Sequence, residues 1–147
     1  MKKQYYSYTQ FLEDSKTLAT KSKDFNADAI LAIARGGMTL GHFMASILNN
    51  RNIFTINSIS YNNENQLSNI EVFNIPDLQK YKTVLIVDDI VDTGKTVKEI
   101  LEILQKKYPN IEFKIASIFY KATACIRPDF FVNEASMWID FFWEADI

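Results

Sequence analysis

Residues 83–96 read Thr-Val-Leu-Ile-Val-Asp-Asp-Ile-Val-Asp-Thr-Gly-Lys-Thr, and this stretch decides the fold. Its apolar run is typical of a strand buried in a parallel sheet, and it ends abruptly at two carboxylates with a third at Asp92. The turn over 93–96 then opens a helical pattern. In α/β sheets, ligands bind at the carboxyl ends of strands, and helix N-termini attract anions. The stretch therefore predicts a site for a molecule with phosphate and hydroxyl groups, with a hard cation nearby.

Strand-like and helix-like segments alternate on both sides of this stretch. A helix is expected over 8–23, where Ser7 and Gln10 have the spacing of a capping box. Residues 62–69 are polar and without periodicity, which predicts a mobile loop. Such alternation favours the α/β class, a mainly parallel twisted sheet flanked by helices, in a single domain over 1–147. The other expected elements are strands over 29–34, 53–61, 70–75, 113–120 and 128–132, and helices over 38–49 and 97–107.

Composition narrows the class of protein. The chain has 147 residues, of which 48% are hydrophobic and 23% charged, as expected for one domain with a sizeable core. Its net charge of −2 and its scattered Lys and Arg side chains predict no nucleic-acid partner. Neither a run of ~20 apolar residues nor a signal peptide is present, which predicts no membrane association. The single cysteine, Cys125, fits a reducing compartment, so a cytoplasmic location is expected.

The sequence Gly94-Lys95-Thr96 also resembles the end of a P-loop, the phosphate-binding motif of nucleotide hydrolases. That motif needs a glycine five residues before Gly94, and this position is Asp89, whose charge would repel phosphate. An arrangement for a sugar phosphate uses the residues better: turn amides hold a monophosphate and the paired acids hold hydroxyls or Mg²⁺ through water. Asp92 is left to take a proton at the reacting centre. Helix capping alone explains an isolated acid pair but not the whole string.

The complete string resembles the phosphoribosyl-pyrophosphate signature of type I phosphoribosyltransferases. In that signature, four apolar residues, two acids and two apolar residues precede Asp-Thr-Gly-x-Thr. Residues 32–37 resemble the family's pyrophosphate loop, and Ser60-Tyr61 match the start of its flexible lid. Lys121 and the tail Trp138-Ile139-Asp140-x-x-Trp143-Glu144 are similar to the bacterial xanthine-guanine enzymes of the 6-oxopurine branch. The resemblance covers most of the chain.

The resemblance implies an activity. Ribose 5-phosphate would pass from phosphoribosyl pyrophosphate to guanine, xanthine or hypoxanthine, with release of pyrophosphate and dependence on Mg²⁺. It also implies a small C-terminal hood, a non-proline cis peptide in the pyrophosphate loop, and a homodimer or homotetramer.

The resemblance also implies a role for each matching residue. Asp92 would be the catalytic acid/base group. The base would contact Lys121, Trp138, Ile139 and Glu144. Phosphoribosyl pyrophosphate would contact Arg35, Gly36, Ser60, Tyr61, Asp88, Asp89, Thr93, Gly94, Lys95 and Thr96, and Asp88 and Asp89 would also hold Mg²⁺ through water.

Two departures from the family pattern keep alternatives open. Residues 60–68 contain no Lys or Arg where the purine enzymes place a basic residue against pyrophosphate, and residues 122–125 lack an arginine often found there. Arg35 is then the main local cation for the leaving group. One alternative is a regulator that keeps this fold and binds phosphoribosyl pyrophosphate together with nucleic acid. The other is a transferase for a different base.

Overall fold

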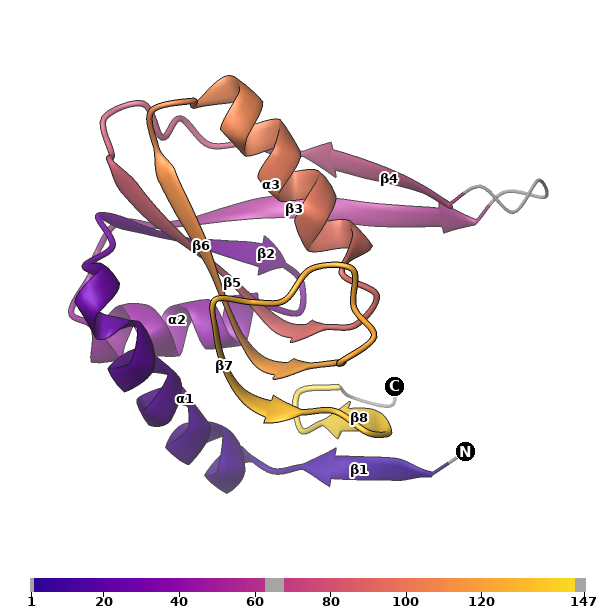
Figure 1. The fold of residues 1–147 in the computed structure, drawn as a ribbon. Helices are drawn as coiled ribbons and strands as arrows, with labels where there is room; N and C mark the ends of the chain where they lie inside the picture. The colour runs from indigo at the N-terminus through magenta and orange to yellow at the C-terminus, as the bar shows by residue number, and fades with distance from the viewer. Residues whose placement is uncertain (1, 63–67, 145–147) are drawn as a thin grey trace.

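A computed structural model describes residues 2–62 and 68–144 and shows a six-stranded sheet in the order β4-β3-β2-β5-β6-β7 (Figure 1). All neighbouring strands are parallel except β4, which is antiparallel to β3. This confirms the predicted α/β class. The elements are β1 (Lys3–Tyr6), α1 (Tyr8–Ser22), η1 (Lys23–Phe25), β2 (Ala29–Ala34), α2 (Met38–Ile47), β3 (Ile53–Asn62), β4 (Ser68–Phe73), β5 (Thr83–Val91), α3 (Lys95–Lys107), β6 (Glu112–Tyr120), β7 (Phe130–Glu134) and β8 (Trp138–Phe141).

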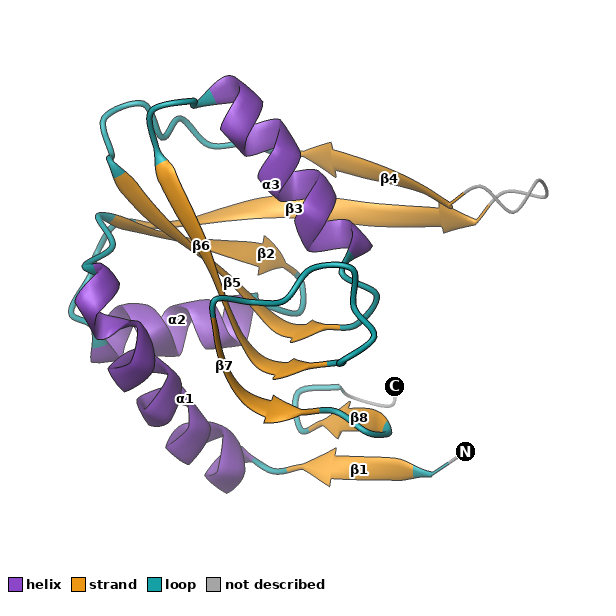
Figure 2. Cartoon of the chain, in the orientation of Figure 1, coloured by secondary structure: helices purple, strands orange, loops and turns teal. Residues whose placement is uncertain are grey.

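Helices cover both faces of the sheet (Figure 2). Helix α3 packs on one face, over a buried cluster that includes Ile86 and Ile100. Helices α1 and α2 pack on the other, over a cluster that includes Leu85 and Met44. Alternate residues of β5 therefore enter opposite cores, which explains why its sequence is apolar without interruption as far as Val87. The paired acids Asp88 and Asp89 follow directly where this burial ends.

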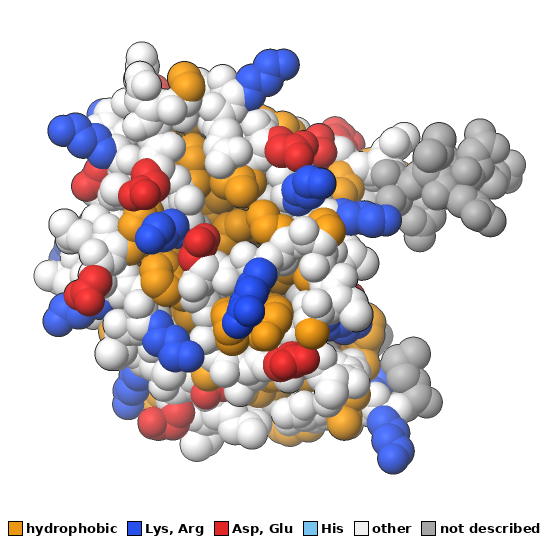
Figure 3. All heavy atoms as spheres, in the orientation of Figure 1, with side chains coloured by type: hydrophobic (Ala, Val, Ile, Leu, Met, Phe, Trp, Pro, Cys, Tyr) orange, Lys and Arg blue, Asp and Glu red, His pale blue; other side chains and the backbone are white. Residues whose placement is uncertain are grey.

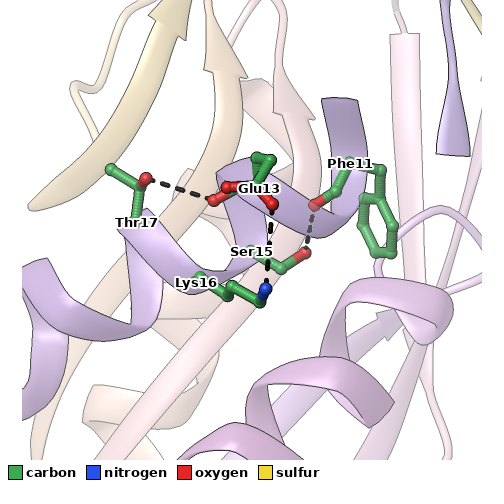
Figure 4. A network of polar contacts seen from close by, with 5 residues as sticks. All are labelled: Phe11, Glu13, Ser15, Lys16 and Thr17. Carbon is green, nitrogen blue, oxygen red and sulfur yellow. Dashed lines mark hydrogen bonds and ion pairs between the residues drawn. The ribbon is translucent and has the colours of Figure 1, made fainter. Parts of the chain in front are cut away.

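Helix α1 begins with the predicted capping box, in which Ser7 and Gln10 satisfy each other's backbone amides. Its buried Ser15 donates its hydroxyl to the carbonyl of Phe11 at 2.7 Å, so the hydroxyl is satisfied despite its burial (Figure 4). On the exposed side Lys16 pairs with Glu13 at 3.7 Å. The polar groups named here all have partners, and the helix packs against β7 at the edge of the sheet.

A second, two-stranded sheet forms a hood beside β7, where β1 pairs in parallel with β8 (Figure 1). Lys3 lies opposite Trp138, and Tyr6 lies opposite Phe141. Strand β1 was not predicted, because such a short segment with a charged and an amide side chain gives no periodic signal and its pairing partner lies at the other end of the chain. The hood itself agrees with the resemblance.

Several predicted boundaries were wrong by two residues. Strand β4 spans 68–73 and not 70–75, since Asn74 adopts a left-handed φ of 59° that ends the strand. Helix α2 ends at Ile47, shortly before Asn49 with φ 50°. Strand β7 starts at Phe130, because the side chain of Asp129 accepts the Ile115 amide at 2.8 Å and takes the place of a strand partner.

The mobile loop predicted over 62–69 lies largely outside the described residues, at 63–67. Its two ends belong to β3 and β4, which form a ribbon that extends beyond the body of the sheet (Figure 1). In the described part of the chain, none of the helices combines the length and apolarity needed to cross a bilayer.

Candidate active site

A cavity of about 260 Å³ lies at the carboxyl ends of β2 and β5, beside the first turn of α3. Residues predicted from the sequence line it together, although they come from separate segments of the chain. The structure thus brings them to one edge of the sheet, as strand polarity requires. The lining is formed by Gly36, Asp88, Asp89, Asp92, Thr93, Gly94 and Thr96, together with Ile33, Ala34, Ser58, Ile90, Val91 and Val97.

The turn before α3 is built to present backbone amides. Gly94 has a φ of 84°, a left-handed conformation that side chains disfavour, and a Cβ there would lie 3.0 Å from the Ile126 amide nitrogen. The Lys95 amide donates to Thr93 Oγ1 at 3.2 Å, and the Cys125 amide donates to the Thr93 carbonyl at 2.8 Å. Helix α3 then leaves its first amides without intrahelical acceptors at the cavity. This geometry suits a bound anion such as a phosphate.

The paired acids at the end of β5 are half-buried and tightly held. The Asp89 amide donates to Asp88 Oδ1 at 2.9 Å, and the Ile90 amide donates to Asp89 Oδ1 at 2.7 Å. Burial raises the pKa of Asp88 well above its ordinary value, and the neighbouring charge of Asp89 raises it further. Burial also raises the pKa of Asp89, and the negative charge of Glu144 adds to this. Ionisation of this acid pair is therefore costly, and a cation or hydroxyl donors would stabilise the ionised form.

The segment after β2 passes close to these acids. A Cβ on Gly36 would lie 2.7 Å from Asp89 Oδ2, so only glycine fits between the loop and the carboxylate. The peptide bond between Ala34 and Arg35 is cis, which agrees with the non-proline cis peptide implied by the resemblance. Arg35 itself is exposed, and its neighbours Ala34 and Gly36 line the cavity.

Asp92 forms an ion pair with Lys121, with 2.7 Å between Asp92 Oδ1 and Lys121 Nζ. The two residues follow β5 and β6, and the Lys121 amide also donates to the Val91 carbonyl at 2.9 Å. Both side chains remain partly exposed, at 48% for Asp92 and 34% for Lys121, so a ligand can reach them. The pair places a proton acceptor beside a cationic donor at the edge of the cavity.

The predicted base-contact residues of the tail lie on and after β8. Trp138 is 50% exposed and Ile139 is only 4% exposed, so the indole is free to receive a ligand while the aliphatic side chain anchors the hood. Phe141 is buried and stacks on Trp143, with ring centroids 4.6 Å apart. Glu144 is exposed, and its charge acts on Asp89 across the site.

Ser60 and Tyr61, predicted to contact the donor, are not among the residues that line this cavity. Both are exposed on β3, and the Tyr61 hydroxyl donates to Glu71 at 3.2 Å. Ser58 lines the cavity and was not predicted from the sequence. A signal was available, because Ser58 is two residues after the buried Ile56, and alternation places the two on the same sheet face.

The raised pKa of Asp88 leads to a prediction about stability. A carboxyl whose folded-state pKa lies above its unfolded value of 3.8 contributes stability at low pH, which is lost as pH rises through the folded-state pKa. Asp88→Asn should therefore raise the melting temperature at pH 8 and change it little at pH 4. The gain at pH 8 should be a few degrees, because about 1 kcal/mol shifts the melting temperature by roughly 2–4 °C in a domain of about 150 residues.

Thermal unfolding at the two pH values measures this effect. Asp77→Asn is the matched control, because Asp77 lies at the opposite end of the sheet and its side chain accepts the Gln79 amide. An equal change in melting temperature at pH 4 and pH 8 for Asp88→Asn would contradict the prediction.

The paired acids at the carboxyl end of β5 and the turn of exposed backbone amides before α3 belong to a mainly parallel sheet. Together they define an α/β protein that binds a phosphorylated, hydroxyl-bearing ligand. Comparison with known proteins makes this more specific. Residues 2–147 match the family described as phosphoribosyl transferase domain, and the chain belongs to this family.

Individual relatives agree with this membership. The chain is 32% identical to the xanthine-guanine phosphoribosyltransferase of Roseobacter denitrificans, over 95% of this chain and 84% of that protein. The structure is similar to that of the Helicobacter pylori xanthine-guanine-hypoxanthine phosphoribosyltransferase, with a TM-score of 0.90 and 38% identity over 97% and 94% of the two chains. A purine phosphoribosyltransferase from Pyrococcus horikoshii gives a TM-score of 0.86 and 31% identity, over 100% and 97%.

Proposed function

We propose that this protein transfers ribose 5-phosphate from phosphoribosyl pyrophosphate to a 6-oxopurine base, namely guanine, xanthine or hypoxanthine, and so acts in purine salvage. The observation that carries the proposal is the cavity that unites the amide turn, the acid pair and Asp92, with Lys121 at its edge. The names of the similar proteins, which act on purines, support the choice of base.

The donor fits the cavity group by group. The 5-phosphate binds at the amides and hydroxyls of residues 93–96, where the helix N-terminus supplies positive potential. The ribose hydroxyls donate to Asp88 and Asp89 in addition to the backbone amides, which offsets the cost of burying the two charges. Pyrophosphate lies at the rim beside Gly36 and Arg35.

In the reaction, a base nitrogen bonds to the ribose C1 while the bond from C1 to the pyrophosphate oxygen breaks. Asp92 accepts the proton that the base loses, since its carboxylate is held at the cavity edge by Lys121. Positive charge develops on the ribose, and nearby carboxylates stabilise it. Exposed Trp138 stacks on the base from the hood, Ile139 contacts its edge through the backbone, and Glu144 closes on its 2-position.

Magnesium is the proposed cofactor. The chain's described residues contain no cluster of three potential ligands among His, Cys, Asp and Glu, so they do not form a closed protein cage for a metal. Two adjacent carboxylates fit an ion that keeps most of its water and is shared with substrate phosphates, which is the common mode for Mg²⁺. When bound, the ion neutralises charge on the departing pyrophosphate. Asp88 and Asp89 would hold it through water.

The choice of base follows from Lys121. An ammonium donates to the 6-oxo group of guanine, xanthine or hypoxanthine, whereas the 6-amino group of adenine is itself a donor and would leave the ammonium unpaired. A pyrophosphate-release assay with Mg²⁺ and a panel of purine and pyrimidine bases tests the proposal. Turnover is expected with at least one 6-oxopurine and not with adenine. Turnover confined to another base, or none, would overturn it.

The proposed partners are small molecules and a second copy of this chain. On the face drawn in Figure 3, Lys and Arg side chains are scattered among acidic ones, which supports the proposal that nucleic acid is not a partner. Exposed apolar side chains on the β3–β4 ribbon, including Ile53, Ile59 and Phe73, support a homodimer or homotetramer. The proposed location is the cytoplasm, which the single cysteine fits. Sedimentation equilibrium would measure this assembly, and a monomer at micromolar concentration would contradict it.

A further inference from the structure

Tyr6 lies at the junction between the hood and the main sheet. Its side chain is 1% exposed, and its ring packs edge-on against Phe119 of β6 at 4.9 Å and Phe141 of β8 at 5.8 Å. Its carbonyl accepts the Phe142 amide at 3.0 Å. Tyr6 therefore contacts the strand that precedes Lys121 and the strand that carries Trp138 and Ile139, since Phe119 lies on β6 and Phe141 on β8.

The hydroxyl of Tyr6 is held by a hydrogen-bond network with Asp14 and Asn133. It donates to Asp14 Oδ2 of α1 at 2.5 Å, and the same oxygen accepts the side-chain amide of Asn133 of β7 at 2.9 Å. Asn133 lies opposite Phe119 in the β6–β7 pairing. Burial is the main cause of a raised pKa for Tyr6, and the hydrogen bond to Asp14 raises it further. The phenol therefore stays protonated and donates throughout the physiological pH range.

We propose that the Tyr6–Asp14–Asn133 network is a positioning device that sets the separation between the hood and β6, and thereby the separation between Trp138 and Lys121 around the base. The three side chains tie β1, α1 and β7 to one carboxylate oxygen. The hood's own sheet has only two strands, which is too little for independent stability, so its position depends on such external contacts. This inference rests on the proposed function, because it assigns the hood to base binding.

The network lies outside the donor site. The residues that line the cavity at the end of β5 include none of Tyr6, Asp14 and Asn133. A change in the network should consequently alter the base half of the site and leave the phosphoribosyl pyrophosphate half unchanged. Loss of a positioning contact misplaces the stacking and donor groups together.

The test begins with Tyr6→Phe, which keeps the ring packing and removes only the hydroxyl. The KM for the 6-oxopurine should rise about three- to tenfold, the effect of one lost hydrogen bond, while the KM for phosphoribosyl pyrophosphate stays within about twofold. Asp14→Leu should have the larger effect because it removes both hydrogen bonds. Asp14→Asn should restore the base KM towards wild type, since its amide oxygen accepts both donors.

Tyr108→Phe is the matched control. The Tyr108 hydroxyl is also part-buried, donating to the Pro76 carbonyl at 2.9 Å and accepting the Leu78 amide at 3.3 Å, but it lies at the far end of the sheet. This variant should lose stability to a similar degree without any selective change in the base KM. The comparison separates positioning from a general loss of stability.

Hydrogen exchange of the hood amides provides a readout that needs no substrate. Tyr6→Phe should speed exchange over 138–141 at least several-fold relative to Tyr108→Phe, with residues 83–96 unchanged. Unchanged hood exchange would overturn the positioning role even in an active enzyme. If the wild type turns over no purine while hood exchange responds, the proposed function fails and the structural part of the inference stands. Equal rises in both KM values would overturn the selective effect on the base.

Discussion

Replacing Asp92 with asparagine should lower kcat by about 10²- to 10⁴-fold, the usual contribution of a positioned acid/base group. Asparagine keeps the shape of the side chain and one acceptor oxygen for Lys121, which lies 2.7 Å from Asp92 Oδ1. It cannot accept the proton that leaves the base. The KM for phosphoribosyl pyrophosphate should stay within about twofold, because we propose that the donor binds through the turn over 93–96 and the acid pair and not through Asp92.

Steady-state kinetics with saturating Mg²⁺ and one 6-oxopurine measure this loss. Asp77→Asn makes the same chemical change at a position remote from the cavity and should leave kcat unchanged. A kcat within about fivefold of wild type would rule out Asp92 as the acid/base group.

The parts of the site that could be predicted from the sequence are those encoded locally. Residues 83–96 contain the strand, its terminal acids and the turn in one continuous stretch, so knowing the strand direction was enough to place them. The same holds for Gly36, since a glycine between a strand and a helix indicates that the backbone passes close to another group. In the structure, Asp89 fills the space that a side chain at position 36 would need.

The parts that could not be predicted depend on contacts between distant segments. Strand β1 acquires its pairing from β8, at the other end of the chain, and neither strand is recognisable alone. The convergence of Tyr6 and Asn133 on Asp14 joins distant parts of the chain and leaves no pattern in the sequence. The donor contacts of Ser60 and Tyr61 stay a prediction from the resemblance: neither residue lines the cavity, whereas Ser58 of the same strand does.

Replacing Lys121 with methionine should lower kcat/KM for 6-oxopurines by about 10- to 100-fold, as expected for loss of a charge-assisted hydrogen bond. Methionine has a similar length and no charge, so packing around β6 is retained. Discrimination against adenine should also weaken, because the donor that adenine leaves unpaired is gone. The measurement is the ratio of kcat/KM for hypoxanthine to that for adenine, with Lys80→Met, an exposed lysine before β5, as the control.

Lys121 has two partners in this interpretation, the 6-oxo group and Asp92, and the variant distinguishes between them. If Lys121 binds the base, hypoxanthine loses much more than adenine, and the ratio of their kcat/KM values falls. If Lys121 acts only by orienting Asp92 through the 2.7 Å ion pair, both bases lose kcat equally and the ratio is unchanged. The double variant with Asp92→Asn sharpens the distinction, because contacting residues show non-additive effects. An unchanged ratio would assign base selection to the hood, where Trp138 and Glu144 lie, and not to β6.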